Sequence, residues 1–136
     1  WNMVASVPLF SHLEAQRIAE IVELLRPRVS VPGEIIVHKD APANCMYFIS
    51  SGQVQVDVPG TPLYLQAGDF FGEIALIEHR KRTASVKTVT SCQLLVLDET
   101  DLEELMASDE TLAAEVHRIS EERRAELDQA NNNSPG

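Results

Sequence analysis

The sequence predicts one α+β domain, a jelly-roll-like antiparallel β-barrel flanked by helices. Apolar residues recur with a helical period near both ends of the chain and with a strand period in the middle. Glycine and proline punctuate the middle section at short intervals. The length of 136 residues, with 44% apolar and 24% charged residues, is that of a single globular unit. We expect an N-terminal helical segment at 1–28, the barrel at 29–97, two C-terminal helices at 98–130 and a disordered tail at 131–136.

The N-terminal segment carries a helix signal. Ser11 followed by Glu14 has the spacing of a capping box. One face of the following helix would carry four apolar residues, namely Ile18, Ile21, Val22 and Leu25. Pro27 ends this pattern, so we expect a helix over about 12–25. A second, short helix is expected at 2–6.

The middle section changes to a period of two. Valines at 54, 56 and 58 alternate with the polar residues Gln53, Gln55 and Asp57, which is typical of a strand with one buried face. Further strands are expected at 34–38, 45–50, 63–65, 84–89 and 92–97, with turn residues between them.

Two more helices close the chain. Asp98 is a candidate N-cap for the first, and Ser108 for the second, over about 109–129. The apolar stripe of the second comprises Leu112, Val116, Ile119 and Leu127.

Charge and composition exclude several function classes. Lys and Arg total 11 against 21 Asp and Glu, and the net charge of −10 argues against nucleic acid as a partner. The four histidines and two cysteines show no metal-ligand spacing, so we expect no metal and no cofactor. Cys45 and Cys92 are expected as reduced, buried thiols. We find no catalytic motif and expect no enzyme.

The residues that could bind a ligand are concentrated in the segment 70–86. Gly72 permits a tight turn, and Glu73–Ile77 is compatible with a short helix whose first N–H groups would face an anion. Arg80, Lys81 and Arg82 follow, and Arg82 at the start of a strand could donate two hydrogen bonds to a phosphate. The residues alone also allow a solvated basic hairpin. The Glu73 carboxylate would repel a phosphate unless it accepts a hydrogen bond from a sugar hydroxyl, which indicates a ligand with both phosphate and ribose.

This segment resembles a known family. Phe71-Gly-Glu-Ile-Ala-Leu76, then five residues, then Arg82-Thr-Ala-Ser-Val86 is similar to the phosphate-binding cassette of the cyclic nucleotide-binding domain family. The resemblance covers about 5–129. It implies an eight-stranded β-roll flanked by helices, with a short phosphate-binding helix inserted in a cassette at about 70–84.

The resemblance also implies a ligand site. Gly72 and its neighbours would hold the cyclic phosphate with Arg82 and Thr83, and Glu73 would bind the ribose 2′-hydroxyl. Val56 and Leu65 would line the base pocket, whereas Tyr64 could point either way. The expected site residues are Phe71, Gly72, Glu73, Ile74, Ala75, Arg82, Thr83, Ala84, Val56, Leu65 and Arg123.

Arg123 continues the apolar stripe of the last helix, where an apolar residue is expected. Its guanidinium could reach water while its stem packs, or it could stack on the purine as a lid. In similar domains of bacterial cyclic nucleotide-gated potassium channels, an arginine similarly placed on this helix caps the base, and this resemblance favours the lid. Arg124 is expected to be an exposed charge.

Bacterial cyclic nucleotide-gated potassium channels are the members that the chain resembles most, through its opening Trp1–Phe10 and its Glu-Arg-Arg at 122–124. The resemblance implies an excised sensor domain, monomeric by itself, on the cytoplasmic side of the plasma membrane. Its last helix would close on the ligand and gate a pore of the same polypeptide in a tetramer. We expect cyclic AMP as ligand, with cyclic GMP still open. A regulatory domain of a transcription factor or kinase, or an interaction module without nucleotide, are the alternatives.

Overall fold

A computed structural model describes residues 10, 11 and 13–132. Within them, eight strands form two four-stranded antiparallel sheets in the orders β1-β8-β3-β6 and β2-β7-β4-β5, which confirms the predicted α+β roll. The strands are β1 (Arg26–Ser30), β2 (Ile35–Val37), β3 (Cys45–Ser51), β4 (Gln53–Asp57), β5 (Leu63–Gln66), β6 (Phe70–Phe71), β7 (Ser85–Thr88) and β8 (Cys92–Asp98). The helices are α2 (Ala15–Leu24), α3 (Glu73–Ile77), α4 (Glu99–Ser108) and α5 (Glu110–Asn132).

Strand β3 lies between two hydrophobic cores, which explains its unbroken apolar run. Successive side chains of a strand point to opposite faces. Tyr47 and Ile49 therefore pack into the core between the two sheets, whereas Met46 and Phe48 pack into the core beneath the helices. All four are buried, so the central strand shows none of the polar alternation of β4.

The N-terminal expectations are corrected at two places. The predicted capping box at Ser11 is wrong, because α2 begins at Ala15 with Glu14 as its N-cap and no side-chain cap bond. The predicted helical boundary at residue 28 is also wrong, because β1 begins at Arg26. Pro27 is tolerated there since β1 is an edge strand and pairs only with β8. The helix predicted at 2–6 lies outside the described residues.

At the C-terminal end, α4 begins after Asp98 as predicted, but α5 is capped differently. The Leu112 N–H donates to Asp109 Oδ1 at 2.9 Å, whereas the predicted cap, Ser108, donates to the Leu105 carbonyl. Helix α5 continues to Asn132, so residues 131 and 132 belong to a helix and not to a disordered tail. Within the described residues, no helix has both the length and the apolar character needed to cross a bilayer.

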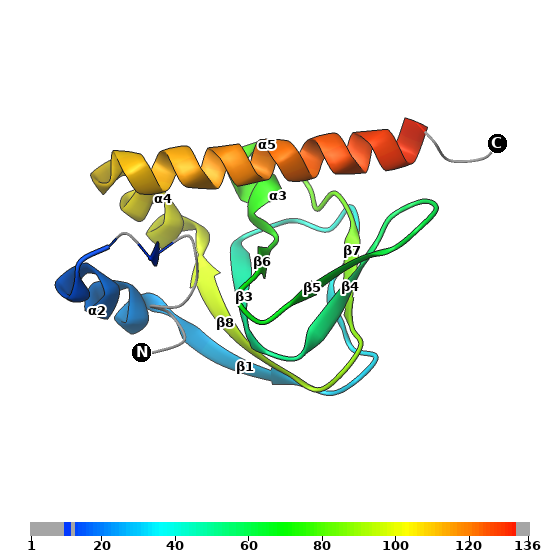
Figure 1. The fold of residues 1–136 in the computed structure, drawn as a ribbon, viewed down its shortest axis with the longest axis horizontal. Coiled ribbons are helices and arrows are strands. Elements are labelled where there is room, and N and C mark those ends of the chain that lie inside the picture. The colour runs from blue at the N-terminus through cyan, green and yellow to red at the C-terminus, as the bar shows by residue number, and fades with distance from the viewer. Residues whose placement is uncertain (1–9, 12, 133–136) are drawn as a thin grey trace.

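Helix α5 runs along one end of the roll, with α3 directly beneath it (Figure 1). Leu112 and Val116, near its start, are buried in the core that the helices share with β3. From Glu121 to Glu126, by contrast, every side chain is exposed except that of Arg123, which is partly buried. Over 121–126, α5 is therefore attached to the roll by polar contacts more than by apolar burial.

Candidate cyclic nucleotide site

One open cavity, whose empty space including solvent at its mouth is about 600 Å³, gathers the residues predicted for the site. Its walls come from the strands β2, β4, β5, β6 and β7, from helix α3 and from helix α5. Every predicted site residue lines it, namely Val56, Leu65, Phe71, Gly72, Glu73, Ile74, Ala75, Arg82, Thr83, Ala84 and Arg123. The structure thus brings together residues from three separate stretches of the sequence.

Arg82 is the buried cation of this cavity. It is only 6% exposed, and its guanidinium donates to the carbonyl oxygens of Gly72 at 2.8 Å and Cys45 at 2.7 Å. Among the ion pairs of the described residues, none involves Arg82. A buried charge without a counter-charge is costly, and an anion in the cavity would remove that cost.

Gly72 joins β6 to α3 in a conformation that favours glycine. Its φ is +91°, in the left-handed region, and it forms the N-cap of α3. A Cβ built at this position would lie 2.8 Å from Arg82 Nη1. Gly72 therefore permits both the turn into α3 and the close approach of the guanidinium to the backbone.

Thr83 follows Arg82 and also lines the cavity. It is half-buried, and its hydroxyl makes no hydrogen bond within the described part of the chain. The hydroxyl is thus available to a ligand beside the Arg82 guanidinium.

Glu73 and Arg123 form an ion pair across the cavity. Arg123 Nη1 lies 3.0 Å from Glu73 Oε1 and also donates to the Phe70 carbonyl, and its guanidinium carbon lies 4.5 Å from the centre of the Phe70 ring. The Glu73 side chain is 1% exposed and that of Arg123 is 21% exposed. The guanidinium is therefore held by the buried Glu73 carboxylate and not free in water, whereas its stacking on a base stays a prediction.

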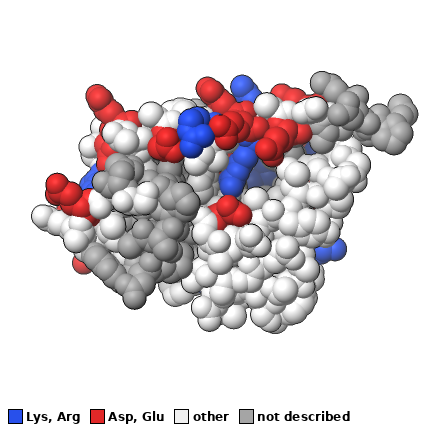
Figure 2. Space-filling model, viewed as in Figure 1, with Lys and Arg blue, Asp and Glu red and all other residues white. Residues whose placement is uncertain are grey.

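Arg124 forms a second contact between α5 and the cassette. It is exposed, as predicted, but its Nη1 pairs with Glu78 Oε1 at 2.8 Å, just after the end of α3. Adjacent arginines of α5 thus bind the carboxylates at the two ends of α3. Figure 2 shows basic and acidic side chains gathered along α5, above a face of the roll with few charges.

The remaining walls are apolar, and sequence reasoning missed part of them. Val37, Leu63 and Val86 line the cavity beside the predicted Val56 and Leu65. Leu63 pairs directly with Val56, and Val86 pairs with it from the other side, so strand register would have identified both. Tyr64 is 54% exposed and does not line the cavity. Glu126, also missed, lies one helical turn after Arg123 at the cavity edge.

Behind the cavity, Tyr47 stacks on Phe71 with 5.1 Å between the ring centres. Burial raises the pKa of the Tyr47 hydroxyl, and its hydrogen bond with Cys45 raises the pKa further. The phenol is therefore held neutral, and this wall contributes no negative charge near Arg82.

Comparison with known proteins identifies the family of the chain. The sequence profile of the cyclic nucleotide-binding domain family matches residues 27–109. The chain is 43% identical over 127 residues to the "Putative potassium channel protein" of Rhodopseudomonas palustris, covering 90% of this chain and 31% of that protein. It is 40% identical over 124 residues to a cyclic nucleotide-gated potassium channel of Rhizobium etli, covering 91% of this chain and 35% of that protein. The chain thus spans about a third of the length of these relatives.

A solved structure shares the fold. The structure described as "Sp-2Cl-cAMPS bound to PKAR CBD2" superposes with a TM-score of 0.85 at 20% identity, over 94% of this chain and 86% of that one. The family predicted from residues 71–86, and the predicted similarity of the chain to bacterial potassium channels, are therefore confirmed. The chain belongs to the cyclic nucleotide-binding domain family.

Proposed function

We propose that this chain binds a cyclic nucleotide, cyclic AMP in preference to cyclic GMP, as the ligand-sensing domain of a potassium channel. The observation that carries the proposal is Arg82, a nearly buried guanidinium at the cavity without a carboxylate partner among the described residues. The similarity to proteins named as channels supports the same conclusion.

The cyclic phosphate binds beside Arg82. The first N–H groups of α3 have no partner within that helix, and they supply further donors together with the Thr83 hydroxyl. The base lies against the aliphatic side chains of Val56 and Leu65. These walls favour adenine, because guanine has an additional carbonyl oxygen and amino group that lose hydrogen bonds to water there. Thr83 can donate to a guanine in the syn conformation, which is why cyclic GMP must be tested.

The ribose of the ligand donates a hydrogen bond to the Glu73 carboxylate. Glu73 accepts a hydrogen bond from Arg123, so a ribose 2′-hydroxyl competes with that guanidinium for the carboxylate. A displaced Arg123 can then stack on the base from the same helix. Ligand binding therefore exchanges one set of contacts of α5 for another.

Gating follows from this exchange. A ligand shifts the position of α5 only as far as it binds the two arrangements with different affinity. In the full-length protein, we propose that this movement of α5 acts on a pore of the same polypeptide, in a tetramer, with this domain on the cytoplasmic side of the membrane.

Calorimetric titration of the chain with cyclic AMP, cyclic GMP and linear 5′-AMP tests the proposal. We expect saturable binding of cyclic AMP that is tighter than that of cyclic GMP and much tighter than that of 5′-AMP. Hydrogen exchange over 110–132 should differ between the free and bound states. A folded chain that ignores both cyclic nucleotides at millimolar concentration would be an interaction module without nucleotide.

A further inference from the structure

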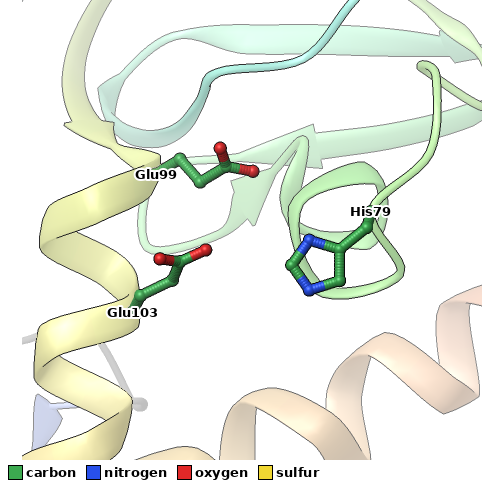
Figure 3. Close-up of side chains that lie close together, drawn as sticks. All are labelled: His79, Glu99 and Glu103. Carbon is green, nitrogen blue, oxygen red and sulfur yellow. The ribbon is translucent and has the colours of Figure 1, made fainter.

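A second group of polar side chains lies outside the cavity. His79, in the loop after α3, faces Glu99 and Glu103 of α4, and one ligand atom from each lies within 4.8 Å of the others. Figure 3 shows the two carboxylates on one face of α4, both pointing toward the imidazole. Glu99 and Glu103 are one helical turn apart. The histidine is distant in sequence, which is why spacing predicted no metal site.

None of these three side chains has a hydrogen-bond or ion-pair partner within the described residues. Two glutamates at i and i+4 repel each other, and no basic side chain pairs with either one. Glu78, one residue before His79, has two arginine partners by contrast. Among the described residues, no ion pair therefore neutralises the two carboxylates of α4.

The group lines a second solvent-open cavity, which shares no lining residue with the first. His117 of α5 lines the same cavity and provides a second imidazole. His79 and Glu99 also line a neighbouring cavity with Arg80 and Lys81, and Arg80 lies 3.6 Å from Glu78. An ion can reach the group from solvent without opening the core.

We propose that His79, Glu99 and Glu103 form a binding site for a divalent transition-metal ion of the Zn²⁺ type. One imidazole nitrogen and two carboxylate oxygens suit Zn²⁺, with water or His117 in a fourth position. Ca²⁺ and Mg²⁺ prefer oxygen ligands alone and are disfavoured by the imidazole. Metal bonds of about 2.0–2.2 Å require the ligand atoms to approach further. His79 and Glu103 are exposed and can rotate to do so.

The bound ion connects the end of the phosphate-binding helix to α4. Both segments belong to the described fold but make no direct side-chain bond in this region. The metal therefore stabilises the folded chain according to its affinity, and the melting temperature rises with metal concentration.

Titration of the ligand-free chain with Zn²⁺, and with Co²⁺ for its visible absorption, tests the site. We expect one ion per chain. His79→Ala, Glu99→Gln and Glu103→Gln should each weaken binding at least about tenfold, because each removes a ligand. His38→Ala and Glu104→Gln are matched controls, exposed and outside the group, and should leave the affinity unchanged.

All five positions are partly or fully exposed, so circular dichroism should show that the variants fold. The proposal is overturned if the unaltered chain binds no Zn²⁺ below millimolar concentration. It is also overturned if the affinity survives in a Glu99→Gln, Glu103→Gln double variant. Neither outcome depends on nucleotide binding, so the metal site and the proposed function can fail separately.

Discussion

Removal of Arg123 should release the second half of α5 from the roll. Between Glu121 and Glu126 the other side chains are exposed, and Arg123 makes the one contact of this stretch with a fully buried carboxylate among the described residues. In Arg123→Ala the Glu73 carboxylate would remain 1% exposed with no counter-charge unless α5 moves away and admits water. Local opening of α5 is therefore the expected response.

The magnitude follows from the burial of each partner. Removing one partner of a fully buried pair costs about 3–5 kcal/mol, whereas exposed pairs contribute about 0–1 kcal/mol. Glu73 is buried but Arg123 is 21% exposed, which places this pair between the two limits. We expect a loss of about 2–3 kcal/mol, which is about a 30- to 150-fold increase in local opening.

Amide hydrogen exchange over 121–132 measures this opening directly. The matched control is Arg124→Ala, because Arg124 is exposed and Glu78 keeps Arg80 as a second partner, so its loss should change exchange less than about fivefold. Exchange in the central strands should stay unchanged in both variants. Equal exchange in the Arg123 variant and the unaltered chain would refute the assignment of α5 attachment to this ion pair, as would an equally large effect of Arg124→Ala.

Three further substitutions test the surrounding structure. Gly72→Ala should lower the free energy of unfolding by at least about 1 kcal/mol more than Gly60→Ala in denaturant titrations. Both glycines have positive φ, but only the Cβ added at Gly72 would clash with the Arg82 guanidinium. Asp109→Ala should cost about 1 kcal/mol in the same assay, through loss of the α5 cap. Burial raises the pKa of Tyr47 above its ordinary 10.0. The contribution of the neutral phenol to the free energy of unfolding is therefore complete below pH 10 and is lost as pH rises through the raised pKa. Tyr47→Phe should reduce this alkaline loss of stability in unfolding curves.

Local sequence signals predicted most elements well. The short helix expected at Glu73–Ile77 has those bounds. The strand expected at 45–50 is β3, which ends one residue later, at Ser51. These elements are specified by residues next to one another, such as the glycine before α3 or the apolar run of β3. The cassette is also contiguous, so its residues could be identified together before the fold was known.

Features that depend on distant partners could not be predicted. The two-residue strand β6 exists through its pairing with Tyr47 and Phe48, and β1 contains a proline that only an edge position tolerates. Asp109 caps α5 in place of the predicted Ser108, whose hydroxyl donates to the Leu105 carbonyl of α4 instead.

The site shows the same division. Val37, Leu63 and Val86 belong to it through strand register, which no local pattern specifies. The helical stripe placed Arg123 on the inward face, but its partner Glu73 is 50 residues away in the sequence. Physical reasoning could predict that an arginine faces inward there, but only the structure shows which carboxylate it meets.

Titration of cyclic AMP against the unaltered chain, Arg82→Ala and Lys81→Ala tests the central claim most directly. Arg82 is 6% exposed at the cavity, whereas the adjacent Lys81 is exposed and outside that cavity. We predict that Arg82→Ala weakens binding by about 2–4 kcal/mol, roughly 30- to 900-fold, and that Lys81→Ala changes it little. Equal affinities for all three proteins, with folding intact, would contradict a phosphate site at Arg82.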